Sequence, residues 1–190
     1  MSISWKGVMP AVTTKFNDKD ELDLEMFSVN IKAQLEAGVS GIILGGTLGE
    51  ASTLTYDEKK ILMKETVKLV KSEVPVIINI AEQTTKGAIQ AAEVAEDCGA
   101  TGLMMLPPMR YKANDYETVT YFKETAKSTS LPIMIYNNPI DYGIMVTLDM
   151  FDELMVCDNI QAVKESTRDI SNITRIKSRF GNRLKVLTGV

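Results

Sequence analysis

Lys164 and Tyr136 are the side chains of this sequence best suited to chemistry. Lys164 closes the apolar run IQAVK at 160–164, where partial burial disfavours the charged form of its amine. A neutral amine is a nucleophile toward carbonyl carbon, as Schiff-base catalysis requires. Tyr136 ends the preceding apolar run, IMIY at 133–136, and its phenol can both donate and accept a proton. The alternative is that Lys164 extends into solvent at a strand end and Tyr136 caps the core.

A glycine-rich segment, GGTLGE at 45–50, is the third candidate. Glycines around Thr47 permit a tight turn whose backbone N–H groups can hold a carboxylate as well as a phosphate. The alternative is a plain turn between a strand and a helix, because such a loop is weak evidence without its context.

The composition excludes several other kinds of site. The sequence has no histidine, which rules out Ser-His-Asp triads, Cys-His dyads and His-ligated zinc. Its 21 basic and 25 acidic residues give a net charge of −4 without a basic block, so we expect no nucleic-acid partner. Cys98 and Cys157 lack redox or metal spacing. No signal peptide or membrane-spanning run is recognisable, so we predict a cytoplasmic protein without membrane association.

Short apolar runs alternate with segments of helical periodicity. Runs that are apolar on both sides are typical of strands in a buried parallel sheet. We predict a helix around residues 27–35 and a second one around 61–70, which follows a Thr55–Glu58 capping box. Further helices are predicted at 84–98, 115–129 and 169–180, the last ended by Gly181. The seven predicted strands are 8–13, 41–44, 76–80, 102–106, 133–136, 160–164 and 185–188.

This alternation predicts an α/β fold with a parallel sheet. An open doubly wound sheet should have a glycine-rich phosphate loop after its first strand, whereas this chain has TTKFNDKDEL there. We therefore expect a TIM (β/α)8 barrel, with residues 1–190 as a single domain. A complete barrel needs about 250 residues, so the barrel is expected to be truncated after the seventh strand, leaving two sheet edges unpaired.

Active sites of such barrels lie at the carboxyl ends of the strands. The residues at those ends include the 45–50 loop, Tyr136, Asn138, Lys164 and Gly189. The lysine, the phenol and the glycine loop all lie at one predicted rim of the barrel. This shared position favours a catalytic or binding role for each over a purely structural one.

The ordered motifs GGTLGE, YNNP and VKESTRD resemble those of the dihydrodipicolinate synthase and N-acetylneuraminate lyase family of class I aldolases. GVMPAVTT and VLTGV resemble the family's first and seventh strands, so the resemblance covers the whole chain.

The resemblance implies a lyase in which Lys164 condenses with pyruvate or a related 2-oxo acid. It implies that Tyr136 relays protons, that Thr47 is hydrogen-bonded to Tyr136, and that the backbone of Gly46 to Leu48 binds the substrate carboxylate. Asn138 and Gly189 are further expected substrate-binding residues. No metal or dissociable cofactor is required, and a homotetramer is implied.

Three departures from the family pattern bear on the substrate. Leu48 stands where a second hydroxyl is usual, Arg110 replaces a tyrosine that reaches across a subunit interface, and Asp141 occupies the place of an arginine that binds a second carboxylate. Arg110 is thus a candidate interface or substrate residue, and Asp141 argues against dihydrodipicolinate synthesis itself.

Alternatives within the family are deamination of 4-hydroxy-pyrroline-2-carboxylate and aldol or dehydratase chemistry on 2-keto-3-deoxy sugar acids. A different class of alternative is a catalytically inactive fragment or assembly partner.

Overall fold

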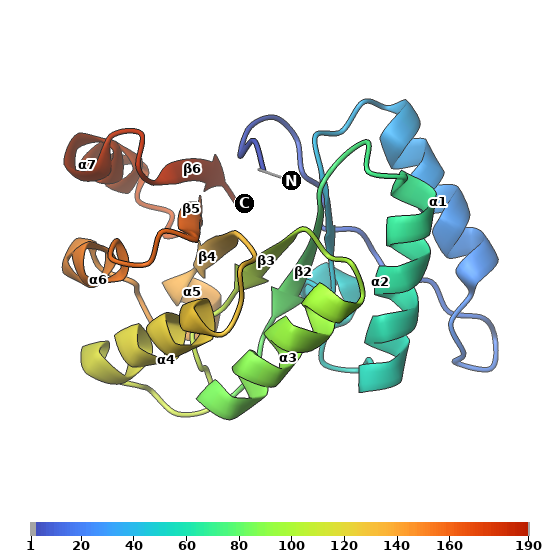
Figure 1. Cartoon of the computed structure of the whole chain (residues 1–190), viewed down its shortest axis with the longest axis horizontal. Coiled ribbons are helices and arrows are strands. Elements are labelled where there is room, and N and C mark those ends of the chain that lie inside the picture. The colour runs from blue at the N-terminus through green and yellow to red at the C-terminus, as the bar shows by residue number, and fades with distance from the viewer. Residues whose placement is uncertain (1–2, 190) are drawn as a thin grey trace.

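Six parallel strands form one continuous curled sheet in the computed structural model, which describes residues 3–189 (Figure 1). Their order in the sheet is their order in the chain, so each crossover leads to the adjacent strand. The strands are β1 (Ile42–Leu44), β2 (Val76–Ile80), β3 (Gly102–Met105), β4 (Ile133–Asn137), β5 (Ile160–Glu165) and β6 (Lys185–Thr188). This is the architecture of a (β/α) barrel that does not close within the described residues, as predicted.

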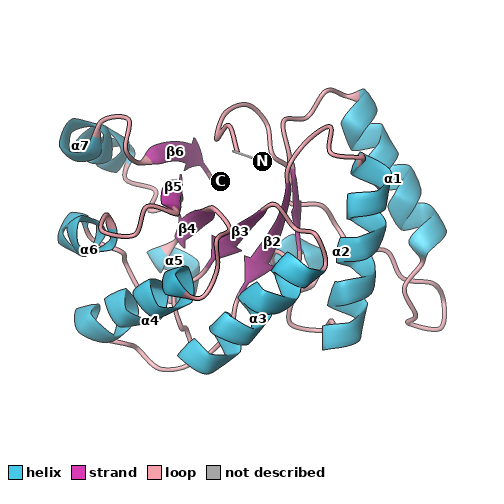
Figure 2. Cartoon of the chain, viewed as in Figure 1, coloured by secondary structure: helices cyan, strands magenta, loops and turns pink. Residues whose placement is uncertain are grey.

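Helices cover the outer, convex side of the sheet (Figure 2). They are α1 (Leu24–Glu36), α2 (Tyr56–Val70), α3 (Thr85–Asp97), α4 (Asp115–Lys127), α6 (Leu148–Leu154) and α7 (Ile170–Phe180). The 3-10 turn η1 (Thr47–Gly49) and the short helix α5 (Pro139–Tyr142) follow β1 and β4 at the carboxyl ends of the strands. The predicted capping box between Thr55 and Glu58 is confirmed at the start of α2, where it satisfies N–H groups that have no helical partner. Within residues 3–189, no helix is both long and apolar enough to cross a bilayer.

The alternation of side chains along the strands divides the core into two layers. Residues that point outward pack against the helices in the larger cluster. Residues that point inward form a smaller cluster around Trp5, with Ile43, Ile77, Met104, Met134 and Ala162. Tyr136 packs against this inner cluster, which shows that the face carrying Tyr136 is the inside of the barrel.

The predicted first strand, residues 8–13, is only partly formed. Ala11 makes an isolated parallel bridge with Ile43, and the Val12 N–H donates to the Ile43 carbonyl at 3.0 Å. Pro10 has no N–H to donate and its carbonyl accepts from Ile43 instead. The segment therefore lies beside β1 where a first strand is expected, but the described sheet has six strands and not seven.

Two short helices between β4 and β5, α5 and α6, were not predicted. Asn138 caps α5, which begins with Pro139 at its first turn, a position where proline is favoured. Thr147 caps α6. The first of these helices supplies a tyrosine to the site described below.

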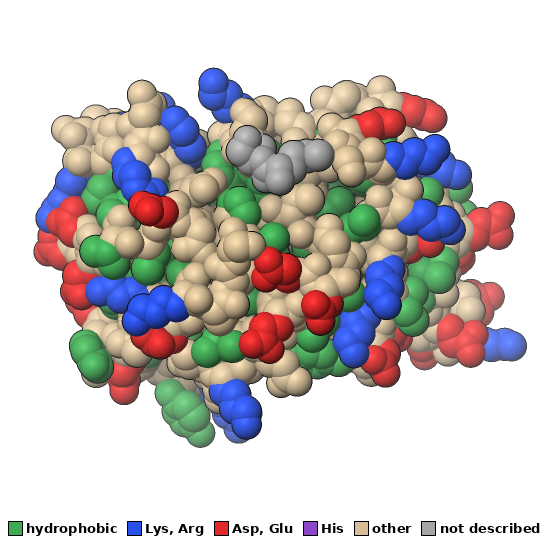
Figure 3. Space-filling view, viewed as in Figure 1, with side chains coloured by type: hydrophobic (Ala, Val, Ile, Leu, Met, Phe, Trp, Pro, Cys, Tyr) green, Lys and Arg blue, Asp and Glu red, His purple; other side chains and the backbone are tan. Residues whose placement is uncertain are grey.

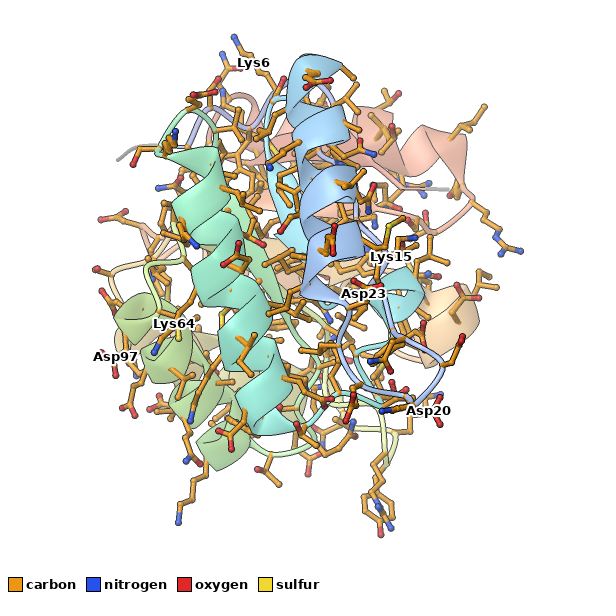
Figure 4. The ribbon with its side chains drawn as sticks, turned by 90° about the vertical axis from the view of Figure 1, so that its right-hand side faces the viewer. Lys6, Lys15, Asp20, Asp23, Lys64 and Asp97 are labelled. Carbon is orange, nitrogen blue, oxygen red and sulfur yellow. The ribbon has the colours of Figure 1, made fainter. Side chains whose placement is uncertain are left out.

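Charged side chains cover the outer surface. In Figure 4, α1 and α2 lie side by side, and Lys64 and Asp97 are among the exposed charges on this side. On the face drawn in Figure 3, basic and acidic side chains are interspersed. That face has no concentrated basic surface of the kind that phosphate backbones require.

Candidate active site

Lys164 and Tyr136 are directly opposite each other on neighbouring strands. The register pairs Tyr136 of β4 with Lys164 of β5, and both are partly buried. Each lies two residues after a member of the inner cluster, Met134 and Ala162 respectively, so both side chains project from the inner face. The sheet thus brings the predicted amine and the predicted phenol together.

The contact between them is with the face of the aromatic ring. The Lys164 Nζ atom lies 4.2 Å from the centroid of the Tyr136 ring, a distance typical of a cation–π contact. Within the described residues, Lys164 forms no ion pair and donates no hydrogen bond. The phenolic oxygen of Tyr136 instead accepts a hydrogen bond from Asn138 Nδ2 at 3.2 Å.

Thr47 is bonded to a different tyrosine from the one that the resemblance implied. Thr47 Oγ1 and Tyr142 Oη share a hydrogen bond of 2.6 Å, so the implied bond to Tyr136 is wrong. Because α5 brings Tyr142 beside Tyr136, the two rings meet edge to face with centroids 5.6 Å apart. Burial raises the pKa of the Tyr142 phenol, with a partly offsetting effect from the Thr47 bond, so this phenol stays protonated at neutral pH.

The glycine loop leads from β1 toward the same place. Gly45 has a φ of 61°, a left-handed conformation that glycine adopts without strain. In the described part of the chain, the backbone N–H groups of Gly46, Thr47 and Leu48 donate to no protein acceptor. The Leu48 side chain is 69% exposed, so this residue offers its backbone and not a buried side chain.

A cavity of about 500 Å³ opens where these elements meet at the carboxyl ends of the strands. Its volume is in the range of small-molecule sites. Six of the predicted site residues line it: Gly46, Thr47, Leu48, Tyr136, Asn138 and Lys164.

Two other predicted residues lie outside this cavity. Gly189 donates its N–H to the Glu165 carbonyl at 2.8 Å and lines a smaller neighbouring cavity of about 150 Å³. A Cβ at Gly189 would lie 3.3 Å from Lys164 Cε and would collide with the Ser166 hydroxyl, so Gly189 is adjacent to the lysine. Arg110 donates its backbone N–H to Gln83 Oε1 at 2.6 Å and has no part in the cavity.

A buried polar network between the sheet and α7 stabilises the carboxyl ends of β4 and β5. The Glu165 carboxylate is buried on the helix-facing side and accepts from Asn137 Nδ2 at 3.2 Å and Asn172 Nδ2 at 3.0 Å. It also accepts the Thr167 backbone N–H at 2.9 Å. Asn137 in turn bonds both backbone groups of Val146. A buried carboxylate needs such donors, and these fix the strand end that carries Lys164.

Sequence reasoning missed Tyr142, which completes the aromatic wall of the cavity. Its signal was the segment NPIDY, with an N-cap asparagine followed by proline. The same turn holds the Asp141 carboxylate, which accepts from Asn138 Nδ2 at 2.7 Å.

The fold and motifs agree with comparisons to known proteins. A family model described as the Dihydrodipicolinate synthetase family matches residues 4–190. A 4-hydroxy-tetrahydrodipicolinate synthase of Exiguobacterium sibiricum is 32% identical over 185 residues, covering 97% of this chain and 63% of the relative.

Solved structures show the same similarity. A dihydrodipicolinate synthase from Aquifex aeolicus superposes with a TM-score of 0.93 at 30% identity, over 97% of this chain and 63% of that one. A prophage protein of the dihydrodipicolinic acid synthase family from E. coli K12, in complex with pyruvate, gives a TM-score of 0.91 at 27% identity, over 98% and 64% of the two chains. The chain thus spans about 63% of the length of these relatives. With this motif order, this sheet and a family match over nearly its whole length, the chain belongs to the dihydrodipicolinate synthetase family.

Proposed function

We propose that this chain carries the catalytic residues of a Schiff-base-forming lyase that acts on pyruvate or a related 2-oxo acid. The observation that carries the proposal is the in-register pair of Lys164 and Tyr136 on the inner face of one cavity. Pyruvate in the complex of the E. coli relative supports the choice of a 2-oxo acid.

The first step would be attack of the neutral Lys164 amine on the ketone carbon. The carbinolamine formed then takes up a proton on its hydroxyl group and loses water to give a protonated imine. The protonated imine accepts the electron pair when a bond at the adjacent carbon breaks, and the resulting enamine supplies that pair when a bond forms there. Attack uses the lone pair of the neutral amine, and the Lys164 Nζ atom lies 4.2 Å from the centroid of the Tyr136 ring. The phenol of Tyr136 would then move protons to and from the adduct.

The substrate carboxylate would be bound by the glycine loop. The backbone N–H groups of Gly46, Thr47 and Leu48 are suited to this role because, among residues 3–189, they donate to no protein acceptor. Thr47 would act on Tyr136 through Tyr142, by way of their shared hydrogen bond and the ring contact. Asn138, which donates to the Tyr136 oxygen, would orient that phenol.

We also propose that residues 1–190 form one domain and that the protein acts as a homo-oligomer. One outer core cluster runs from α1 to α7, which supports a single folding unit. Tyr111, beside Arg110, is 78% exposed, as an aromatic residue at a subunit contact would be. Tyr111→Asp should lower the mass measured by sedimentation if this contact forms, and an unchanged mass would exclude it from the interface.

To test the activity, the protein is incubated with a panel of 2-oxo acids and aldol products, and the release of a carbonyl product is measured. We expect wild type and Lys177→Ala, which lacks an exposed lysine of α7, to turn over the same substrate, and Lys164→Ala to be inactive. Equal activity of Lys164→Ala and wild type would exclude the imine mechanism.

A further inference from the structure

Arg168 occupies an unusual backbone conformation at the edge of the cavity. Its φ is 62°, in the left-handed region that residues other than glycine, asparagine and aspartate seldom adopt. It lies in the short loop between β5, which carries Lys164, and α7. A residue held in such a conformation next to a site suggests that its position serves the site.

The guanidinium of Arg168 has no ion-pair partner among residues 3–189. The nearest acidic residue in the chain, Asp169, caps α7 and pairs with Arg175. The positive charge of Arg168 is therefore not neutralised by the protein residues described.

Arg168 lines the same cavity as Lys164, and it also lines the smaller one beside Gly189. The charged side chains around the larger cavity are Lys164, Arg168 and Asp141. The Asp141 carboxylate is already bound to Asn138 Nδ2. One positive charge is thus in excess, which favours an anionic ligand.

We propose that Arg168 determines specificity by binding a second carboxylate of the substrate, so that the preferred 2-oxo acid carries a distal carboxylate. This inference rests on the proposed function, which assigns Lys164 to the imine and the loop amides to the first carboxylate. Arg168 is then the remaining cation of the cavity, and its planar guanidinium suits bidentate carboxylate binding. Arg168 thus binds the second carboxylate in place of residue 141, where the family has an arginine and this chain has an aspartate.

The test compares a monocarboxylic and a dicarboxylic 2-oxo acid. Pyruvate and 2-oxoglutarate are each titrated against the protein with borohydride present, and the concentration that gives half-maximal labelling of Lys164 is measured. Arg168→Asn removes the charge while keeping a residue that tolerates the left-handed backbone. Arg168→Lys keeps the charge, and Lys177→Asn removes an exposed positive charge from α7, away from the cavity.

We expect Arg168→Asn to raise the half-saturating concentration of 2-oxoglutarate about fivefold, as expected for loss of a partly exposed ion pair, and to leave that of pyruvate unchanged. Arg168→Lys should restore part of the difference, added salt should reduce it, and Lys177→Asn should change neither acid. Equal effects of Arg168→Asn on both acids, or no effect on either, would overturn the inference.

Calorimetric titration with glutarate, which has no ketone, makes the same comparison without an imine. Weaker glutarate binding by Arg168→Asn than by wild type supports the role of Arg168 even if no imine forms. Binding that is equally strong or equally absent in the two proteins contradicts it. Failure of pyruvate to label wild type would contradict the proposed function, and the glutarate titration would still decide the role of Arg168.

Discussion

Replacing Asn137 with alanine should remove the central member of the buried network behind the active site. The Asn137 side chain is completely buried at the end of β4. Its amide donates to the Val146 carbonyl at 3.1 Å and to Glu165 Oε2 at 3.2 Å, and its oxygen accepts the Val146 N–H at 2.9 Å. Asn137→Ala therefore leaves both backbone groups of a buried residue without partners.

The expected cost follows from these three bonds. Each of the two neutral bonds to Val146 contributes about 1 kcal/mol, and the bond to the Glu165 carboxylate about 1.5–3 kcal/mol. Their sum is about 3.5–5 kcal/mol, a large part of the ~5–15 kcal/mol by which a typical domain is stable. Glu165 keeps its bonds from Asn172 and the Thr167 N–H, which limits the loss.

Urea unfolding followed by circular dichroism measures this loss of unfolding free energy. The control is Asn182→Ala, at an exposed asparagine whose side-chain oxygen accepts one long hydrogen bond, from Lys185 Nζ at 3.5 Å. This substitution should cost less than about 0.5 kcal/mol. A loss below about 1 kcal/mol for Asn137→Ala would refute the view that this network holds the strand ends together.

Three further outcomes are expected. Gly49→Ala should lower the free energy of unfolding by about 1–3 kcal/mol in the same urea assay, because its Cβ would lie 2.9 Å from the Val12 carbonyl oxygen; an unchanged midpoint would contradict this close packing. Burial raises the pKa of the Cys157 thiol, so iodoacetamide should label it more slowly than free cysteine at neutral pH, as read by mass spectrometry, and equal rates would count against the burial. The hydrogen bond from Ser171 holds the pKa of Asp169 below its ordinary value. The ionised Asp169 carboxylate therefore contributes to stability above about pH 4, and this contribution is lost as the pH falls through the lowered pKa. The difference in urea midpoint between wild type and Asp169→Asn should shrink on acidification, and a difference that grows would contradict a stabilising role of the carboxylate.

The sequence predicted the features that depend on local pattern. The capping box of Thr55 and Glu58 and the runs that became β2 and β6 needed only residue types at fixed spacing. The pairing of Lys164 with Tyr136 followed from the parallel sheet, because successive strands end at the same rim.

Features that depend on tertiary contacts could not be predicted in this way. Pro10 reduces the first predicted strand to a bridge, and the helix that carries Tyr142 is only four residues long, too short for a periodic signal. Tyr142, and not Tyr136, then takes the bond to Thr47. The left-handed backbone of Arg168 gives no signal in the residue type, since arginine is not typical of that conformation.

The most direct test of the central claim is the covalent capture of pyruvate by Lys164. The 190-residue chain is incubated with pyruvate and sodium borohydride, and the site of modification is identified by peptide mass spectrometry. We expect one reduced pyruvate adduct per chain, on the peptide containing Lys164, and none in Lys164→Ala. A folded wild-type protein that stays unmodified, or that is labelled equally at exposed lysines such as Lys177, would contradict imine formation at Lys164.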